Sequence, residues 1–490
     1  MIKIKGASSC NLVLYGSFVI YYYLILIFSI LVLRTHADHR KLSVVDQHVD
    51  VDPQEGLKEK DRITELLGQP GKVNFGQYGG YVTVDKNAGR AFFYYFVEAD
   101  GPNKDSAPLL LWLNGGPGCS SVGLGAMTEI GPFRVKSDGK TLFQNIFAWN
   151  KVANVLFLDS PTGIGFSYSN TTSDTENNGD ARTAADGYSF LLNWLERFPE
   201  YKNRDFYISG ESYGGHYVPQ LADTILQNNK LALSNKNMII NLKGISIGNP
   251  SLDKAVDDAG TYEFLWSHAL ISDNEIMKLR KDCNFSQLTD ECIDEVSMIW
   301  KRGENYNEYN IYAPVCHTEE GVVTEKPNDI SILNNDPCSE NYVLHYMNLP
   351  EVQLALHANV TKLNYTWELC STQRHWKDSP SNMIPVLQNL LTNGLRVLVY
   401  SGDFDSKIPY GSTIQVLKRL NLTEKVPWNQ WNVSDEIGGS NVEYNEGLTF
   451  STVRGAGHMV PRDQPERALT MIKCFLQGEP LPKFVDKPWV

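Results

Sequence analysis

Short apolar segments bounded by turn residues recur along most of the chain. Several are rich in β-branched or aromatic side chains, and they cover residues 81–84, 91–97, 109–114, 154–161, 205–209, 243–250 and 396–402. Segments of this kind lack the polar alternation of half-exposed strands and are typical of strands buried on both faces. The pattern therefore predicts a sheet whose strands are largely covered by other elements.

Helical periodicity lies between these segments. The clearest case is residues 180–201, where Pro199 ends an apolar stripe made of Tyr188, Leu191, Leu192, Leu195 and Phe198. Strands that alternate with helices favour a mostly parallel sheet with helices on both faces. The sequence therefore predicts an α/β fold.

The pattern changes between residues 251 and 342. This region has four cysteines, many charged residues and no strong strand segment, and residues 317–336 form a polar run. We predict a helical cap over residues 251–342, inserted into a single α/β domain over residues 38–490. A polar loop of this length is often functional or open to proteases, so processing within the insertion stays open.

The N-terminus carries a long apolar segment. Leu12 to Leu33 is 22 residues long, follows Lys3 and Lys5, and is long enough to span a bilayer. Small residues ending at Ala37 favour cleavage as a signal peptide over residues 1–37, with a retained membrane anchor as the alternative. Both interpretations place the rest of the chain in the lumen.

Glycosylation motifs and cysteines also indicate the secretory pathway. Of the eight cysteines, Cys10 lies in the leader, and no close spacing among the others fits a zinc knuckle. Disulfides with one thiol left over are favoured, and their connectivity does not follow from spacing. The six acceptor motifs for N-glycosylation are at Asn170, Asn284, Asn359, Asn364, Asn421 and Asn432.

Overall composition is that of a globular protein. The chain has 490 residues, of which 42% are hydrophobic and 21% charged, and its formal net charge is −13. The chain has no basic run, and its net negative charge argues against a nucleic-acid partner. We interpret this charge as a contribution to solubility. Membrane association follows only if the N-terminal segment is retained.

Three side chains follow predicted strands in an informative order. Ser212 lies in the G-x-S-x-G motif of residues 210–214, which is typical of a nucleophile elbow. Asp403 and Asp405 follow a later strand, and His458 follows the strand over residues 448–453. The order Ser, Asp, His is that of an α/β-hydrolase triad. The spacing G-x-x-D-x-x-I-P favours Asp405 as the acid, with Asp403 supporting the turn.

The roles follow from the chemistry of acyl transfer. Ser212 attacks a carbonyl carbon, His458 carries the proton, and Asp405 orients the imidazole. The tetrahedral oxyanion needs two fixed donors, for which we predict the backbone N–H groups of Tyr213 and Gly116. This chemistry needs no cofactor and no metal ion.

Five motifs carry a resemblance to a known family. They read "WLNGGPGCSS", "LDSPTGIGFSYS", "GESYGGHYVP", "YSGDFD" and "GAGHMVP". Together they look like the serine carboxypeptidase family, above all its vacuolar and secreted plant members, from about Asp61 to Gln477. The resemblance implies the α/β-hydrolase fold, peptide or protein C-termini as substrates, and a secreted or vacuolar location.

The resemblance also implies a site for the free carboxylate of the substrate. In this family Asn114 and Gly115 would hold that carboxylate, together with Glu129 and Glu211, and Trp112 would line the pocket. Two neighbouring carboxyls cannot both ionise cheaply, so the pair keeps a proton. A protonated pair can donate to the substrate carboxylate, which agrees with the family's preference for acidic pH.

The family pattern implies which cysteines are paired. It also allows a homodimer and cleavage within the insertion, neither of which the sequence decides. The implied disulfides are Cys119–Cys370, Cys283–Cys292 and Cys316–Cys338, with Cys474 left free.

Three functions stay open. The first is a carboxypeptidase that acts through an acyl-enzyme at acidic pH. The second is an acyltransferase that uses glucose esters, but such relatives usually carry Asp before the nucleophile and Ser-Gly after the tyrosine, where this chain has Glu211 and Gly214–Gly215. The third is a catalytically silent binding glycoprotein. Side-chain specificity is not predicted: in this family the region that corresponds to residues 406–447 borders the pocket for the side chain of the leaving residue, and here that segment resembles the family less than the motifs around it do.

Overall fold

The computed structural model describes residues 51–483, except 103, 236–237, 304–305, 320, 325–335, 360–361, 363–365 and 372–374. The predicted leader over residues 1–37 and the acceptor Asn364 lie outside the described residues. The described residues belong to one compact unit.

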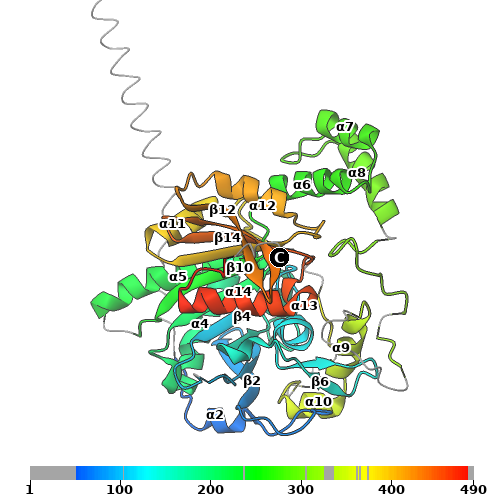
Figure 1. Cartoon of the computed structure of the whole chain (residues 1–490). Helices are drawn as coiled ribbons and strands as arrows, with labels where there is room; N and C mark the ends of the chain where they lie inside the picture. Colours follow the sequence, from blue (N-terminus) through cyan, green and yellow to red (C-terminus); the bar gives the residue numbers. More distant parts are fainter. Residues whose placement is uncertain are drawn as a thin grey trace, which may run out of the picture. The chain divides into compact units, whose positions relative to one another are not determined.

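A large mixed sheet organises this unit (Figure 1). Six strands pair in parallel at its centre, and antiparallel strands extend both edges. The central strands, in spatial order, are β7 (Asn154–Leu158), β4 (Leu109–Leu113), β9 (Phe206–Glu211), β10 (Leu242–Gly248), β11 (Arg396–Gly402) and β14 (Leu448–Val453). The flanking strands are β1 (Arg62–Ile63), β2 (Gln77–Asp85), β3 (Arg90–Val97) and β8 (Tyr168–Ser169) beyond β7, and β13 (Glu436–Tyr444) and β12 (Glu424–Val433) beyond β14.

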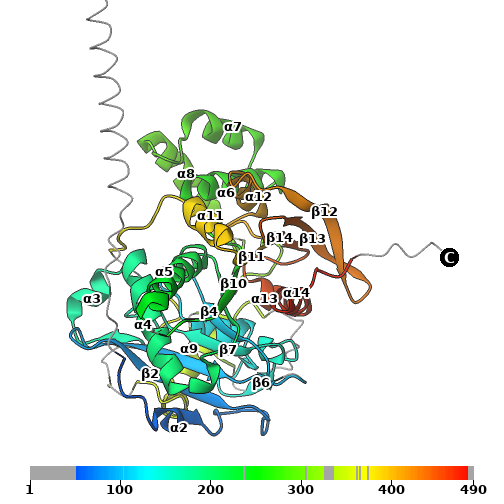
Figure 2. The same cartoon turned by 90° about the vertical axis from the view of Figure 1, so that its left-hand side faces the viewer.

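The apolar segments of the sequence form these strands as predicted. All five residues of β4 and of β7 are buried, because helices cover both faces of the sheet. Figure 2 shows α4 (Asp180–Arg197) and α5 (Gly214–Asn235) on one side of the sheet, and α13 (Val460–Asp463) and α14 (Pro465–Gln477) on the other. The apolar stripe predicted for residues 180–201 is the buried face of α4, and Pro199 lies just past its end.

The parallel centre of the sheet determines where polar side chains meet. Strands β4, β9, β10, β11 and β14 all run in one direction, so their carboxyl ends lie at the same edge. In open α/β sheets, ligands bind outside the carboxyl ends of the strands. Residues that directly follow these strands are therefore the candidates for a functional site.

One hairpin lies in the segment whose sequence pattern is uninformative. Strands β12 and β13 are joined by Ser434 and Asp435, which both have positive φ (50° and 67°), as two-residue hairpin turns require. Half of the residues of β12 are exposed, and only Trp431 and Val433 of this strand are buried. Because this edge strand buries so little, its sequence lacks the apolar signal of the central strands.

The chain between β10 and β11 is helical among the described residues. Figure 1 shows α6 (Lys254–Ser267), α7 (Asp273–Asp282) and α8 (Asp290–Gly303) grouped next to α12 (Tyr410–Lys418). These helices lie in the region for which a cap is predicted. They share a small apolar core of their own, made of Tyr262, Leu265, Ile271, Ile276, Leu279 and Ile299. The other helices described between β10 and β11 are α9 (Ser339–Met347), α10 (Pro350–Ala355) and α11 (Ile384–Thr392).

Three disulfides join the cysteine pairs that the family resemblance implies. Two staple the helical region, while the third links distant parts of the chain. Cys474 is free and half-buried. The disulfides are Cys119–Cys370, Cys283–Cys292 and Cys316–Cys338.

Removal of the long-range disulfide is expected to destabilise the protein more than removal of a short one. Cys119 and Cys370 are 251 residues apart, so in the chain-entropy model the bond contributes about 5 kcal/mol. Cys283 and Cys292 are 9 residues apart, which corresponds to about 2.5 kcal/mol. Denaturant unfolding of the two double Cys→Ser variants measures the difference, and equal losses would contradict the entropic argument.

Surface features bear on the secretory predictions. The acceptors Asn170, Asn284 and Asn421 are exposed, whereas Asn359 and Asn432 are half-buried. Glycosylation at these positions stays a prediction. Among the helices that the structure describes, none combines the length and the apolar character needed to cross a bilayer.

Candidate active site

Ser212 lies on a sharp turn between β9 and α5. Its φ is 59°, an unfavourable value for a residue with a side chain, and its N–H donates to Gly248 O at 2.9 Å. A Cβ on Gly210 would lie 2.4 Å from Leu113 O, so the turn requires glycine there. The geometry is that of a nucleophile elbow, and Ser212 is half-buried at the carboxyl edge of the sheet.

Asp405 and His458 come together from the ends of β11 and β14. His458 Nδ1 and Asp405 Oδ2 are 2.7 Å apart, and both side chains are buried. Asp405 also accepts hydrogen bonds from Asn249 Nδ2 (2.7 Å), Lys407 N (2.7 Å) and Ile408 N (3.2 Å). These donors hold the carboxylate in one orientation toward the imidazole.

Asp403 has a different environment from Asp405. Its Oδ1 accepts the N–H of Gly455 at 2.7 Å, on the turn that leads to His458. Burial raises the pKa of Asp403 above its ordinary value. Asp403 therefore supports the turn, as the motif spacing predicts.

No hydrogen bond joins Ser212 Oγ to His458 among the described residues. Such bonds are often long in enzymes without substrate and shorten in the bound complex. The two residues are connected indirectly through β10, because Gly248 O accepts from Ser212 N and the neighbouring Asn249 donates to Asp405. Asn249 is a site residue that the sequence analysis missed.

The helical region contributes a second missed residue. Tyr309 O accepts the backbone N–H of His458 at 2.6 Å, and the two rings are 5.1 Å apart. A Cβ on Gly457 would lie 2.1 Å from Tyr309 O, so this approach requires glycine. The glycines before His458 indicate in the sequence that another segment packs closely against this loop. They do not indicate that this segment contains Tyr309.

The loop after β4 packs against the nucleophile turn. A Cβ on Gly115 would lie 2.4 Å from Tyr213 N and 2.8 Å from Ser212 Cβ. Gly116 has a φ of 111°, which favours glycine, and it lines the same cleft as Ser212. The loop is thus in position to bring the backbone of Gly116 close to the reacting atoms.

This cleft has a volume of about 780 Å³. Its walls come from the nucleophile turn, the start of α6, residues 285–288, residues 379–381 and the loop after Asp405. Asp257 lines it, and burial raises the pKa of this carboxyl to about 7. The cleft is therefore bordered on one side by the helical region and on the other by the ends of the strands.

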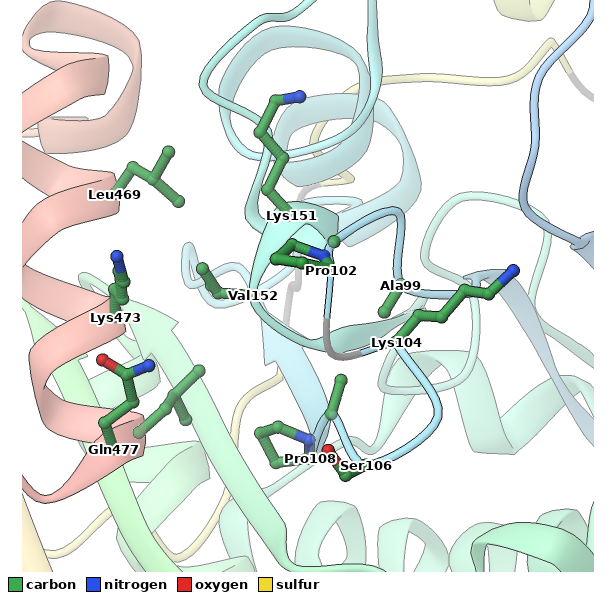
Figure 3. A pocket seen from close by; sticks show the side chains of 13 residues that line it. Ala99, Pro102, Lys104, Ser106, Pro108, Lys151, Val152, Leu469, Lys473 and Gln477 are labelled. Carbon is green, nitrogen blue, oxygen red and sulfur yellow. The ribbon is translucent and has the colours of Figure 1, made fainter.

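A second pocket, of about 450 Å³, is remote from this edge (Figure 3). Pro108, which precedes β4, lies in its wall, so it is at the amino ends of the strands. The ammonium groups of Lys104, Lys151 and Lys473 point in different directions and do not converge. None of the predicted site residues lines this pocket.

Two buried carboxyls, those of Glu129 and Glu211, lie close to the Ser212 turn. Asn114 Nδ2 donates to Glu129 Oε1 at 2.9 Å and to Glu211 Oε1 at 3.1 Å. Trp112 Nε1 donates to Asn114 Oδ1 at 2.6 Å and fixes the orientation of the amide. Glu129 ends the π-helix η1 (Ser121–Glu129), and Glu211 directly precedes Ser212.

The two carboxyls have raised pKa values. Burial raises the pKa of Glu129, and burial together with the charge of Glu129 raises the pKa of Glu211 well above its ordinary value. Among the described residues, no N–H or hydroxyl group donates to the buried Oε2 atoms of these side chains, and a hydrogen bond between the two carboxyls raises the pKa of Glu211 further. A proton retained by the pair would remove the repulsion between two neighbouring charges.

Buried arginines lie close to this pair. The positive charge of Arg462 lowers the pKa of both carboxyls and opposes the effect of burial. Arg134 donates to the backbone oxygens of Glu129 (3.1 Å) and Pro461 (3.2 Å), while Arg462 donates to Glu340 at 2.8 Å. Neither arginine lies in a motif that the sequence analysis singled out.

The sheet, the flanking helices and the nucleophile turn define the α/β-hydrolase fold. A solved structure with the same architecture is Kex1Δp, a prohormone-processing carboxypeptidase from Saccharomyces cerevisiae. It has a TM-score of 0.72 and 25% identity, and the match covers 86% of this chain and 96% of that one.

The chain belongs to the serine carboxypeptidase family, whose sequence profile matches residues 68–478. Among relatives from Arabidopsis thaliana, serine carboxypeptidase-like 40 is 54% identical over 436 residues, which are 88% of this chain and 85% of the relative. Serine carboxypeptidase 24 is 47% identical over 441 residues, or 87% of this chain and 94% of the relative. The family resemblance stated from the motifs is thus confirmed.

Proposed function

We propose that this protein is a serine carboxypeptidase that releases C-terminal residues from peptides at acidic pH. The observation that carries the proposal is the buried pair Glu129 and Glu211, bridged by Asn114, directly beside the Ser212 turn. A site with a protonated carboxyl and an amide donor is complementary to a free carboxylate. Placing that carboxylate next to the nucleophile selects the last peptide bond of a chain.

The first half of the reaction forms an acyl-enzyme. Ser212 Oγ attacks the carbonyl carbon while His458 Nε2 takes the hydroxyl proton, and the imidazolium is stabilised by Asp405. The N–H groups of Gly116 and Tyr213 stabilise the oxyanion. His458 then gives its proton to the leaving amine, and the C–N bond breaks.

The second half releases the shortened peptide. Water attacks the ester of Ser212, His458 accepts a proton from that water, and Ser212 Oγ leaves with the proton that His458 returns. The chain's own residues supply the nucleophile of the first half and the proton carrier of both halves, and water is the nucleophile of the second. An acceptor other than water at this stage would make the same site an acyltransferase.

Release of C-terminal residues from N-blocked dipeptides between pH 4 and 8 tests the proposal. We expect release that is highest below about pH 6, where the carboxyl pair retains its proton. No release from any dipeptide, combined with Ser212-dependent acyl transfer from a glucose ester, would replace the peptidase by the acyltransferase. If the folded protein has no activity in either assay, the catalytically silent binding glycoprotein becomes the favoured function.

Glu211 favours the peptidase over the acyltransferase. Acyltransferase relatives usually carry Asp at the position of Glu211, and Ser-Gly after the tyrosine. This chain has Glu211 and, after the tyrosine, Gly214 and Gly215. The longer side chain of Glu211 lets its carboxyl reach Asn114 at 3.1 Å.

The three disulfides agree with a secretory protein, since such bonds form and persist in oxidising compartments. We propose a secreted or vacuolar location. Immunolocalisation of the full chain would test this, and a cytosolic signal would contradict it.

A further inference from the structure

Asp180, the first residue of α4, is buried beside the nucleophile turn, although no motif includes it. Its side chain is 1% exposed, and its carboxylate accepts four hydrogen bonds. Because a carboxylate offers about four lone-pair sites, these donors fill its capacity. The donors are Tyr213 Oη (2.9 Å) and Trp376 Nε1 (2.8 Å) to Oδ1, and His216 Nδ1 (3.0 Å) and Gln220 Nε2 (2.7 Å) to Oδ2.

Three of the four donors belong to the nucleophile turn and the first turns of α5. Tyr213, His216 and Gln220 are spaced by three and four residues, so they share one face of the helix. Asp180 therefore joins the start of α4 to the start of α5. The fourth donor, Trp376, comes from a segment far along the chain that also lines the cleft through residues 379–381.

The side chain of Tyr213 is held on several sides. Its ring stacks on the ring of His216 at 4.5 Å and 11°, and it meets Trp376 edge-on at 5.7 Å and 86°. Its hydroxyl is also 2.6 Å from Ser379 Oγ. With the bond to Asp180, these contacts leave the ring a single orientation.

The orientation of Tyr213 matters because its backbone N–H is a proposed oxyanion donor. The peptide unit between Ser212 and Tyr213 is planar, so a shift of Tyr213 turns this N–H. Gly115 packs against the same nitrogen, where a Cβ would lie only 2.4 Å away. A small displacement would therefore change the alignment between the donor and the reacting oxygen.

We propose that Asp180 is a positioning residue that holds Tyr213 so that its N–H faces the oxyanion. The inference rests on the proposed function, because it assumes acyl transfer at Ser212. Burial opposes ionisation of Asp180, yet the hydrogen bonds from His216 and Gln220 keep its pKa below the ordinary value. A carboxylate at the N-terminus of a helix is also favoured by the helix dipole.

The test compares Asp180→Asn with a matched control on the same helix. In Asp180→Asn one carboxylate oxygen becomes an NH2 group, which cannot accept the two hydrogen bonds that this oxygen received. We expect kcat for an N-blocked dipeptide to fall about tenfold to a hundredfold with KM unchanged, since the lost alignment acts only in the transition state. The control Asp186→Asn removes a similarly buried carboxylate that pairs with Arg90, and it leaves kcat unchanged.

Reaction of Ser212 with an organophosphonate provides a readout that does not depend on peptidase activity. We expect Asp180→Asn to slow phosphonylation by a factor similar to its effect on kcat. If the wild-type protein is not labelled at Ser212, the proposed function fails. If it is labelled and Asp180→Asn reacts equally fast, only the role of Asp180 fails.

A second variant keeps the test valid if Asp180→Asn does not fold. Tyr213→Phe preserves the ring and removes only the hydroxyl that donates to Asp180. It should lower kcat in the same direction by a smaller factor, with KM unchanged. Where both single variants fold, kcat of the double variant Asp180→Asn/Tyr213→Phe should fall by less than the product of the two single fold-changes. The reason is that the two residues act through one contact. Independent effects, or a loss in KM alone, would overturn the inference.

Discussion

Replacement of Ser212 by alanine is expected to lower kcat for an N-blocked dipeptide about 10⁶-fold, the scale found when a triad nucleophile is lost. Nothing else in the described site can form the acyl-enzyme, since His458 and Asp405 serve only to move and stabilise a proton. Release of the C-terminal amino acid measures the loss. Residual activity near that of the wild type would show that Ser212 is not the nucleophile.

Ser212→Gly provides the matched control for folding. It is expected to be as inactive as Ser212→Ala but more stable by about 1 kcal/mol, because glycine accepts the φ of 59° without strain. Denaturant unfolding measures the difference. Equal stability of the two variants would mean that the turn relaxes once the serine hydroxyl is gone.

The second large effect is expected in the pH dependence of Glu211→Gln. In the wild type, kcat/KM should fall about tenfold per pH unit once the pair Glu129 and Glu211 loses its shared proton, since an ionised pair repels the substrate carboxylate. A glutamine at position 211 remains a donor at every pH. The fall above neutral pH should therefore become much weaker in the variant.

Glu129→Gln and an amidated dipeptide serve as controls for this prediction. Glu129→Gln should weaken the pH dependence as Glu211→Gln does, because either change removes the repulsion within the pair. An amidated dipeptide carries no carboxylate for the ionised pair to repel. Its cleavage should be slow, and its kcat/KM should not show the decrease with rising pH that the pair causes. An unchanged pH slope in both variants would show that another group controls the profile.

The same pKa shifts predict how stability depends on pH. The pair has a raised pKa in the folded state, so its contribution is fully present below the ordinary pKa of glutamate, about 4.3, and is lost as pH rises through the raised value. Relative to the wild type, Glu211→Gln should gain stability between acidic and neutral pH. Thermal unfolding across that range measures this trend.

The order of the proposed triad is readable in the sequence because each of its residues lies in the turn or loop that follows a strand of the sheet. The parallel strands β9 and β11 are recognisable from their apolar runs, and β14 from its position before the glycine-rich loop of His458. Parallel strands of this kind end at one edge of the sheet. The order of elements along the chain therefore already places Ser212, Asp405 and His458 in one region. The distinction between Asp403 and Asp405 also follows from motif spacing.

Residues that act through contacts far along the chain are not readable in this way. Tyr309 reaches His458 from the helical region, and Asp180 reaches Tyr213 from the start of another helix. No local pattern marks either contact, since both depend on how separate segments pack. The edge hairpin β12–β13 escapes prediction for a related reason, because an exposed strand has no burial signal.

By itself, the sequence determined the α/β order of elements, the nucleophile turn and the family, because apolar periodicity and glycine-rich turns are local properties. Only the tertiary structure decided which polar groups meet around them. Glu129 lies at the end of η1, and its hydrogen bond to Asn114 and shared environment with Glu211 exist because three segments converge in a buried space. Burial and charge proximity set the pKa values of that pair, and both are properties of packing rather than of sequence order.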